Sequence, residues 1–203
     1  MHRLANAHQG EDIYVIGSGP SCSYIEPEFF ADRIAIGVNH AYKRFPVNYV
    51  IMKENLSERT TDLPLIASRY AFGSHQHPEN KADYIFSHHD NRNNKIKWQD
   101  LQPNGERFVV SNSTITSAIH IAAFMGARAV FLVGHDCCEI DGDLRFEGYN
   151  KLHEQKENAY RRWVSELEVQ TMQVRDYIKR EYGIPVHSIN PFVSMRMEGH
   201  TIR

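Results

Sequence analysis

Short apolar runs rich in Val and Ile recur along the chain, separated by polar or glycine-containing stretches. Runs of this length and composition are typical of strands that are buried on both faces of a parallel sheet. The pattern predicts strong strands at 12–16, 34–38, 48–52, 129–133 and 186–189, and weaker strands at 69–72 and 84–86.

Helical spacing of apolar residues predicts two longer helices. Ile115, Ala118, Ile119 and Ala122 recur at intervals of three and four residues, which predicts a helix of roughly 12 residues with a face of small side chains. A second helix is expected at about 155–181 and is ended by Gly183. Shorter helical segments are predicted at 26–31, 39–42 and 65–67.

Strands that alternate with helices favour an α/β fold with a doubly wound, mostly parallel, Rossmann-like sheet of about six or seven strands. We expect residues 1–203 to form a single nucleotide-binding domain. A polar insert is predicted near 87–106, and its histidines lack the accompanying ligands of a metal site. A small lid is predicted near 139–153, a polar segment with two glycines.

Composition and charge exclude several classes of protein. The chain has 203 residues, 41% of them hydrophobic, which is enough for a sizeable core. A net charge of −2 argues against binding of nucleic acid. We find neither an apolar run of membrane-spanning length nor the apolar core of a signal peptide.

The three cysteines give no disulfide framework and fit a reducing, cytoplasmic setting. Peripheral attachment to the inner face of the membrane stays open as an alternative, as does a homo-oligomer.

The most suggestive motif is the turn Gly17-Ser18-Gly19-Pro20-Ser21, which directly follows the first strand. Two glycines let the backbone approach a ligand closely, and a helix beginning after such a turn commonly presents N–H groups to a phosphate. A tight turn without a ligand is the alternative. We expect a side chain at Gly19 to block a ligand and to disturb the fold less.

The turn is not a dinucleotide fingerprint. Cys22 occupies the sixth position, where Gly or Ala is expected, and Asn39 stands where a ribose-binding carboxylate is expected. NAD and FAD are therefore not predicted ligands.

Further polar residues follow other predicted strands or begin a helix, where ligand-binding groups gather in open α/β sheets. Thr116 and Ser117 stand at a helix start, where they could equally act as caps. Asn39 could equally be a turn residue. Gly134, His135 and Asp136 follow the strand at 129–133.

Four stretches in unbroken order carry a resemblance to a known family: Gly17–Ser21, Val38–Tyr42, Ile115–Ala118 running into Phe131–Asp136, and Gly183–Val186 followed by Asn190-Pro191-Phe192. On these stretches the chain resembles the bacterial sialyltransferases that modify lipo-oligosaccharide. It also resembles a wider set of α/β proteins that includes flagellin-glycosylation proteins and archaeal hydroxymethylpterin diphosphokinases.

The resemblance implies a glycosyltransferase that takes a nucleotide-activated sugar, with a CMP-sugar as the candidate donor, and transfers it by direct displacement to a glycan or another hydroxyl acceptor. It implies no required metal or other cofactor. It implies that the nucleotide contacts are made by Gly17, Ser18, Gly19, Pro20, Ser21, Asn39, Thr116 and Ser117, although the family carries Asn at the position of Ser18.

The family's lid supplies tyrosines and a histidine general base. The matching residues here are Phe146, Tyr149 and His153, with His153 as the catalytic candidate. A surface histidine is the alternative interpretation of His153.

Two other functions stay open. A pterin- or nucleotide-directed diphosphokinase would need Mg²⁺, for which Asp136 is a candidate ligand. A non-catalytic nucleotide-binding module would bind the same ligands without turnover.

Overall fold

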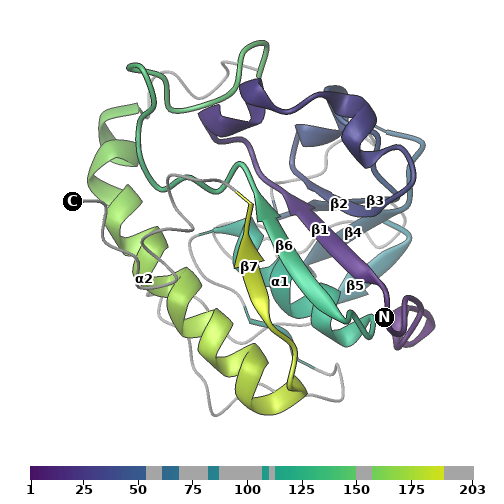
Figure 1. The fold of residues 1–203 in the computed structure, drawn as a ribbon. Helices are drawn as coiled ribbons and strands as arrows, with labels where there is room; N and C mark the ends of the chain where they lie inside the picture. The colour runs from purple at the N-terminus through teal and green to yellow at the C-terminus, as the bar shows by residue number, and fades with distance from the viewer. Residues whose placement is uncertain (54–60, 69–81, 87–106, 110–112, 150–156, 190–203) are drawn as a thin grey trace.

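A computed structural model describes residues 1–53, 61–68, 82–86, 107–109, 113–149 and 157–189, with the backbone alone for 157–165. It contains a seven-stranded sheet in which every pairing is parallel (Figure 1). The strands are β1 (Asp12–Ile16), β2 (Ile34–Val38), β3 (Tyr49–Met52), β4 (Leu65–Ser68), β5 (Tyr84–Phe86), β6 (Ala129–Val133) and β7 (Val186–Ser188). They lie in the order β5-β4-β3-β2-β1-β6-β7.

The structure confirms the α/β class and the parallel sheet. It also confirms the helices α1 (Thr114–Phe124) and α2 (Glu157–Tyr182). The segments predicted as helical at 26–31 and 39–42 are the short 3-10 helices η3 (Pro27–Phe30) and η4 (Ala41–Lys43). The predicted strand at 69–72 and the insert at 87–106 lie outside the described residues.

The helix predicted at 65–67 is wrong, because these residues form β4. All four residues of β4 are buried, and β4 pairs with β3 on one side and β5 on the other. The run is too short for its periodicity to separate a strand from a helix, so the pairing partners decide its conformation.

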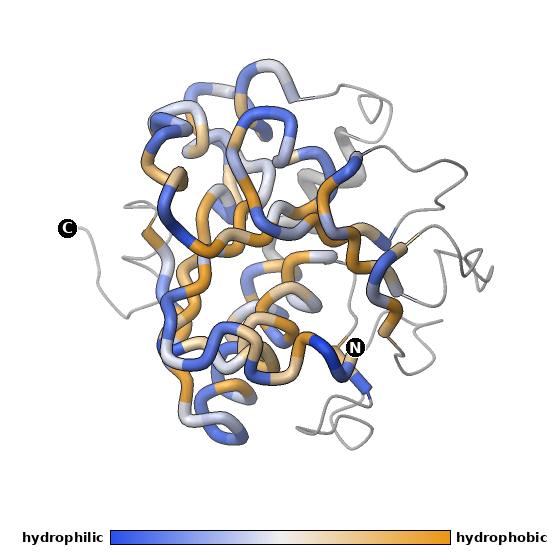
Figure 2. The backbone as a smooth tube through the Cα atoms, turned by 90° about the vertical axis from the view of Figure 1, so that its right-hand side faces the viewer, coloured by the Kyte–Doolittle hydropathy of each residue, from blue (hydrophilic) through white to orange (hydrophobic). Residues whose placement is uncertain are grey.

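The two α-helices pack on the same face of the sheet. Residues of α1 and α2 share one apolar cluster with inward-facing strand residues such as Ile13, Val15 and Ile36, each fully buried. Burial of one such side chain contributes about 1.5–3 kcal/mol. Figure 2 shows the apolar stretches gathered at the centre of the molecule, where strands and helices meet. No helix in the described part is both long and apolar enough to cross a membrane.

The opposite face carries the 3-10 helices η2 (Pro20–Tyr24), η3 and η4. A second apolar cluster forms there, in which Phe30, Phe45 and Phe146 pack edge to face, with ring centroids 5.4 and 5.9 Å apart. This cluster joins the loops that follow β1, β2 and β6.

The order of the strands creates a switch point beside β1. The chain moves outwards through β2, β3, β4 and β5, and then returns to place β6 on the other side of β1 (Figure 1). Open α/β sheets bind ligands at the carboxyl ends of the strands beside such a switch point, and we call this edge beside β1 and β6 the candidate crevice.

A buried histidine of α1 fastens the segment 107–109 to the fold. The Val109 N–H donates to Nδ1 of His120 over 2.9 Å, and Nε2 of His120 lies 2.8 Å from the Tyr182 hydroxyl. Since Nδ1 accepts, the proton of this neutral imidazole is on Nε2. Burial lowers the pKa of His120 to about 3.

We expect His120→Gln to destabilise the protein in a pH-dependent way. At pH 7.5 the loss should be about 1–3 kcal/mol, because a buried N–H loses a well-placed acceptor. Below the unfolded pKa of about 6.5, the unfolded wild type takes up a proton that the folded state excludes. Wild-type stability then falls by up to about 1.4 kcal/mol per pH unit towards pH 3.

The variant has no imidazole at position 120 and so does not lose stability in this way. The difference in unfolding free energy between wild type and variant should therefore become smaller as the pH falls. Urea unfolding of both proteins at pH 7.5, 6.5 and 5.5 measures it. A gap that stays constant would show that His120 titrates normally in the folded state.

Candidate functional site

The turn after β1 lies directly against the loop after β6. The Gly17 N–H donates to the Val133 carbonyl, and the Gly19 N–H donates to the Gly134 carbonyl, each over 2.7 Å. These bonds continue the β1–β6 pairing beyond the strands. They place two predicted segments, Gly17–Ser21 and Gly134–Asp136, side by side at the switch point.

A carboxylate locks the same two loops together. Asp136 is buried and accepts the backbone N–H of Ser21 at 2.7 Å and its hydroxyl at 2.6 Å. Hydrogen bonds to a charged acceptor are the stronger kind, worth about 1.5–3 kcal/mol each. Asp136 and Ser21 thus fix the geometry of the crevice.

Glycine is required in both loops because of this close approach. A Cβ on Gly19 would lie 2.5 Å from an oxygen of Asp136 and 2.7 Å from the Gly134 carbonyl oxygen. Gly134 has φ +61°, and a Cβ there would collide with the Cys22 sulfur. A side chain at Gly19 was expected to abolish ligand binding with a smaller effect on the fold. This is corrected, because the added Cβ would first clash with Asp136 and Gly134 of the protein itself.

The turn has few N–H groups left for a phosphate. Those of Gly17, Gly19 and Ser21 are bonded within the protein, and Pro20 has none. The helix that follows is the five-residue 3-10 helix η2, not an α-helix. Of the backbone groups of this turn, the Ser18 N–H makes no hydrogen bond among the described residues, so side chains of neighbouring segments would have to supply further donors to an anion.

Asn39 sits at the carboxyl end of β2 with an open acceptor. Its φ is +54°, and its N–H donates to the Ile51 carbonyl over 2.9 Å. Its side-chain oxygen is buried and has no hydrogen-bond partner among the described residues. A buried acceptor of this kind is costly unless a ligand or water satisfies it.

Thr116 and Ser117 lie at the same edge, but both side chains are fully buried. The Thr116 hydroxyl donates to the Ser113 carbonyl over 2.8 Å, and the Ser117 hydroxyl donates to the Val109 carbonyl over 2.7 Å. The cap of α1 is Ser113, whose side chain accepts the Ile115 N–H. Ser117 and His120 together hold both backbone groups of Val109.

The His135 side chain contacts α2. Its Nε2 lies 2.6 Å from the Thr171 hydroxyl, which itself donates to the Leu167 carbonyl over 2.8 Å. Nε2 must therefore carry the proton. Burial lowers the pKa of His135 to about 4, so the ring is neutral at physiological pH.

The described part of the predicted lid, 139–149, covers the loop after β2. The Phe146 N–H donates to the Ser18 carbonyl over 3.0 Å. The Tyr149 ring is buried, with its centroid 6.0 Å from that of His40. Tyr149 thereby joins Asn39 and the glycine turn at one edge. His153 lies outside the described residues.

Sequence reasoning missed the buried lysine Lys53. This lysine directly follows β3, and burial lowers its pKa to about 7. Its place after a strand, at the edge where the other candidates gather, was the available signal. Across the described ranges, no group of three or more His, Cys, Asp or Glu side chains could hold a metal ion.

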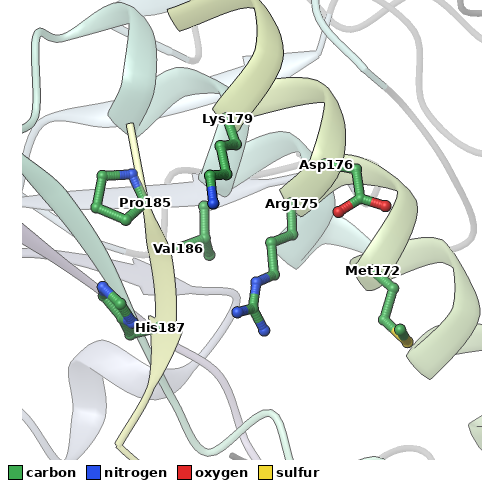
Figure 3. Close-up of a pocket in the computed structure, with 7 residues that line it drawn as sticks. All are labelled: Met172, Arg175, Asp176, Lys179, Pro185, Val186 and His187. Atoms are coloured by element: carbon green, nitrogen blue, oxygen red, sulfur yellow. The ribbon is translucent and has the colours of Figure 1, made fainter. Parts of the chain in front are cut away.

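A separate pocket of about 230 Å³ lies between α2 and β7 (Figure 3). None of the predicted site residues lines it. Its walls come from Met172, Arg175, Asp176 and Lys179 of α2 and from Pro185, Val186 and His187.

The fold is similar to that of a solved bacterial sialyltransferase. The structure of CstII from Campylobacter jejuni in complex with cytidine-5'-monophosphate matches with a TM-score of 0.56 and 13% identity, over 96% of this chain and 85% of that chain. The sialyltransferase CST-II in complex with a trisaccharide acceptor and CMP matches with the same TM-score and identity, over 95% and 86%. This confirms the resemblance drawn from the sequence at the level of the fold.

No protein-family model matches the chain, and no curated protein matches it in sequence.

We expect Gly19→Ala to destabilise the fold by about 1–3 kcal/mol, because the added methyl overlaps Asp136 and the Gly134 carbonyl. Gly142→Ala is the control, since its Cβ would meet nothing within 4 Å and only its φ of +87° is strained. Urea unfolding measures both. A Gly19→Ala protein of wild-type stability would mean that the turn has room for a ligand.

We expect Ser117→Ala to lower the free energy of unfolding by about 1–3 kcal/mol, because the buried Val109 carbonyl loses its donor. Nucleotide affinity should stay within about twofold of wild type, a difference of about 0.4 kcal/mol. Calorimetric titration of the folded variant tests this. A loss of affinity at unchanged stability would instead make Ser117 a ligand group.

Proposed function

We propose that this chain is a glycosyltransferase that uses a CMP-activated sugar. The observation that carries the proposal is the match of its fold, over 95% of the chain, to a sialyltransferase in complex with CMP and an acceptor. Within that fold, the predicted motifs after β1, β2 and β6 meet at the switch point of the sheet, where open α/β sheets bind ligands.

Asn39 is assigned to the nucleotide. Its unpartnered side-chain oxygen would accept a hydrogen bond from a ribose hydroxyl or from the amino group of cytosine. The Gly17–Ser21 turn, held by Asp136, forms the wall beside it. Tyr149, on the covering segment, would shield the bound nucleotide from water, which limits hydrolysis of an activated sugar.

The chemical step would be direct displacement at the anomeric carbon. The acceptor hydroxyl oxygen forms the new bond as the bond to the CMP phosphate oxygen breaks, and the hydroxyl proton passes to a base. We assign the base to His153, because a neutral imidazole can take a proton near neutral pH. The CMP that departs carries the negative charge, which the protein has to stabilise.

A thermal-shift panel of CMP, UDP, ATP and GTP, each with and without Mg²⁺, tests the nucleotide. CMP at about 100 times its dissociation constant should stabilise the protein by roughly 2.7 kcal/mol, without Mg²⁺. A response to ATP that requires Mg²⁺ would favour a diphosphokinase. CMP binding without turnover of any CMP-sugar would favour a binding module.

We expect His153→Ala to slow single-turnover transfer by about 10²–10⁴-fold, while the dissociation constant of CMP stays within twofold. His2→Ala is the control, because His2 is exposed and lies on the amino-terminal 3-10 helix. Transfer rates near those of the wild type in the His153 variant would show that another residue acts as the general base.

A further inference from the structure

Arg44 places a cation beside the glycine turn. It follows η4 on the loop after β2, and its guanidinium carbon lies 5.4 Å from the centroid of the Phe45 ring and 5.8 Å from that of Phe146. Phe146 is itself hydrogen-bonded to the Ser18 carbonyl of the turn. Three loops that follow β1, β2 and β6 thus meet around this side chain.

The charge of Arg44 reaches the residues beneath the turn. Burial raises the pKa of the Cys22 thiol, the Asp136 carboxylate raises it further, and Arg44 acts in the opposite direction. Cys22 in turn packs against Gly134 and the Gly17 carbonyl. Arg44 therefore places positive charge close to Cys22, beneath the turn.

Arg44 has no anionic partner in the described part of the chain. Its Nε is buried and makes no hydrogen bond there, and no carboxylate is paired with the guanidinium. The nearby Asp136 binds Ser21 through both oxygens. A partly buried guanidinium held between aromatic rings without a carboxylate has its donors ready for an anion from outside the protein.

The turn next to it needs such a donor. The N–H groups of Gly17, Gly19 and Ser21 are bonded within the protein, so a phosphate beside the turn would find few backbone donors. Arginine suits the task, because its planar fork can bind two phosphate oxygens at once.

We propose that Arg44 binds the phosphate of the nucleotide and stabilises its negative charge as the nucleotide departs. The proposal rests on the proposed use of a nucleotide donor. Under this proposal the phosphate is bound by the loop after β2 instead of by the glycine turn.

The test compares ligands that differ only in the phosphate. Arg44→Met removes the charge and keeps an unbranched apolar stem between the two rings. By calorimetric titration, the dissociation constant of CMP should rise at least about tenfold, or about 1.4 kcal/mol, whereas that of cytidine should change less than twofold. Arg44→Lys should give an intermediate loss for CMP, since it keeps the charge without the fork.

Arg33→Met is the matched control. Arg33 also stacks on an aromatic ring, 4.0 Å from the Phe29 centroid, but it is exposed and precedes β2, at the opposite end of the strand. It should leave both ligands unaffected. Equal losses of CMP and cytidine binding in Arg44→Met would assign Arg44 a structural role, and unchanged CMP binding would overturn the proposal.

Binding of inorganic pyrophosphate tests the anion site at Arg44 independently of the proposal that the protein uses a CMP-activated sugar. If the wild type binds none of the nucleotides, the proposed function fails and Arg44 is still tested with this anion alone. Saturable pyrophosphate binding that weakens about tenfold in Arg44→Met supports an anion site at Arg44. Equal binding by the two proteins, or none by either, overturns it.

Discussion

The contact between the turn after β1 and the loop after β6 is the constraint on which the carboxyl edge of this sheet depends. The chain reaches β6 only after forming four other strands outwards from β1, so two segments distant in sequence must close the gap at the switch point. Glycines allow their backbones to touch, and Asp136 fastens the contact through Ser21. The crevice inherits its shape from this internal contact, before any ligand is bound.

Much of the fold could be predicted from the apolar runs, because a strand buried on both faces has a nearly continuous run of apolar residues such as Val and Ile. β1, β2 and β6 are of this kind. β4 was missed because Leu65-Ile66-Ala67 carries no period of its own, and only its pairing with β3 and β5 decides its conformation.

The sequence indicated which residues lie near the candidate site, but not which contacts and hydrogen bonds they make. Gly19 was expected to make room for a ligand, yet its neighbour is Asp136. Ser117 was expected near the nucleotide, yet its hydroxyl holds the Val109 carbonyl. Spacing along the chain reveals which residues reach the carboxyl edge, but the hydrogen-bond partners come from segments far away in sequence. Arg44 escaped notice for the same reason, since its setting is made by Phe146.

The two faces of the sheet are covered by helices that differ in length and in how far they unfold together with the core. On one face, α1 and α2 form multi-turn helices that share one continuous core. On the other face, η2, η3 and η4 are 3-10 helices of five, four and three residues, joined by aromatic rings. Short 3-10 turns open at little cost, whereas long packed helices unfold together with the core. We therefore expect the segments around η3 and η4 to open locally while the sheet and the Asp136–Ser21 contact stay intact.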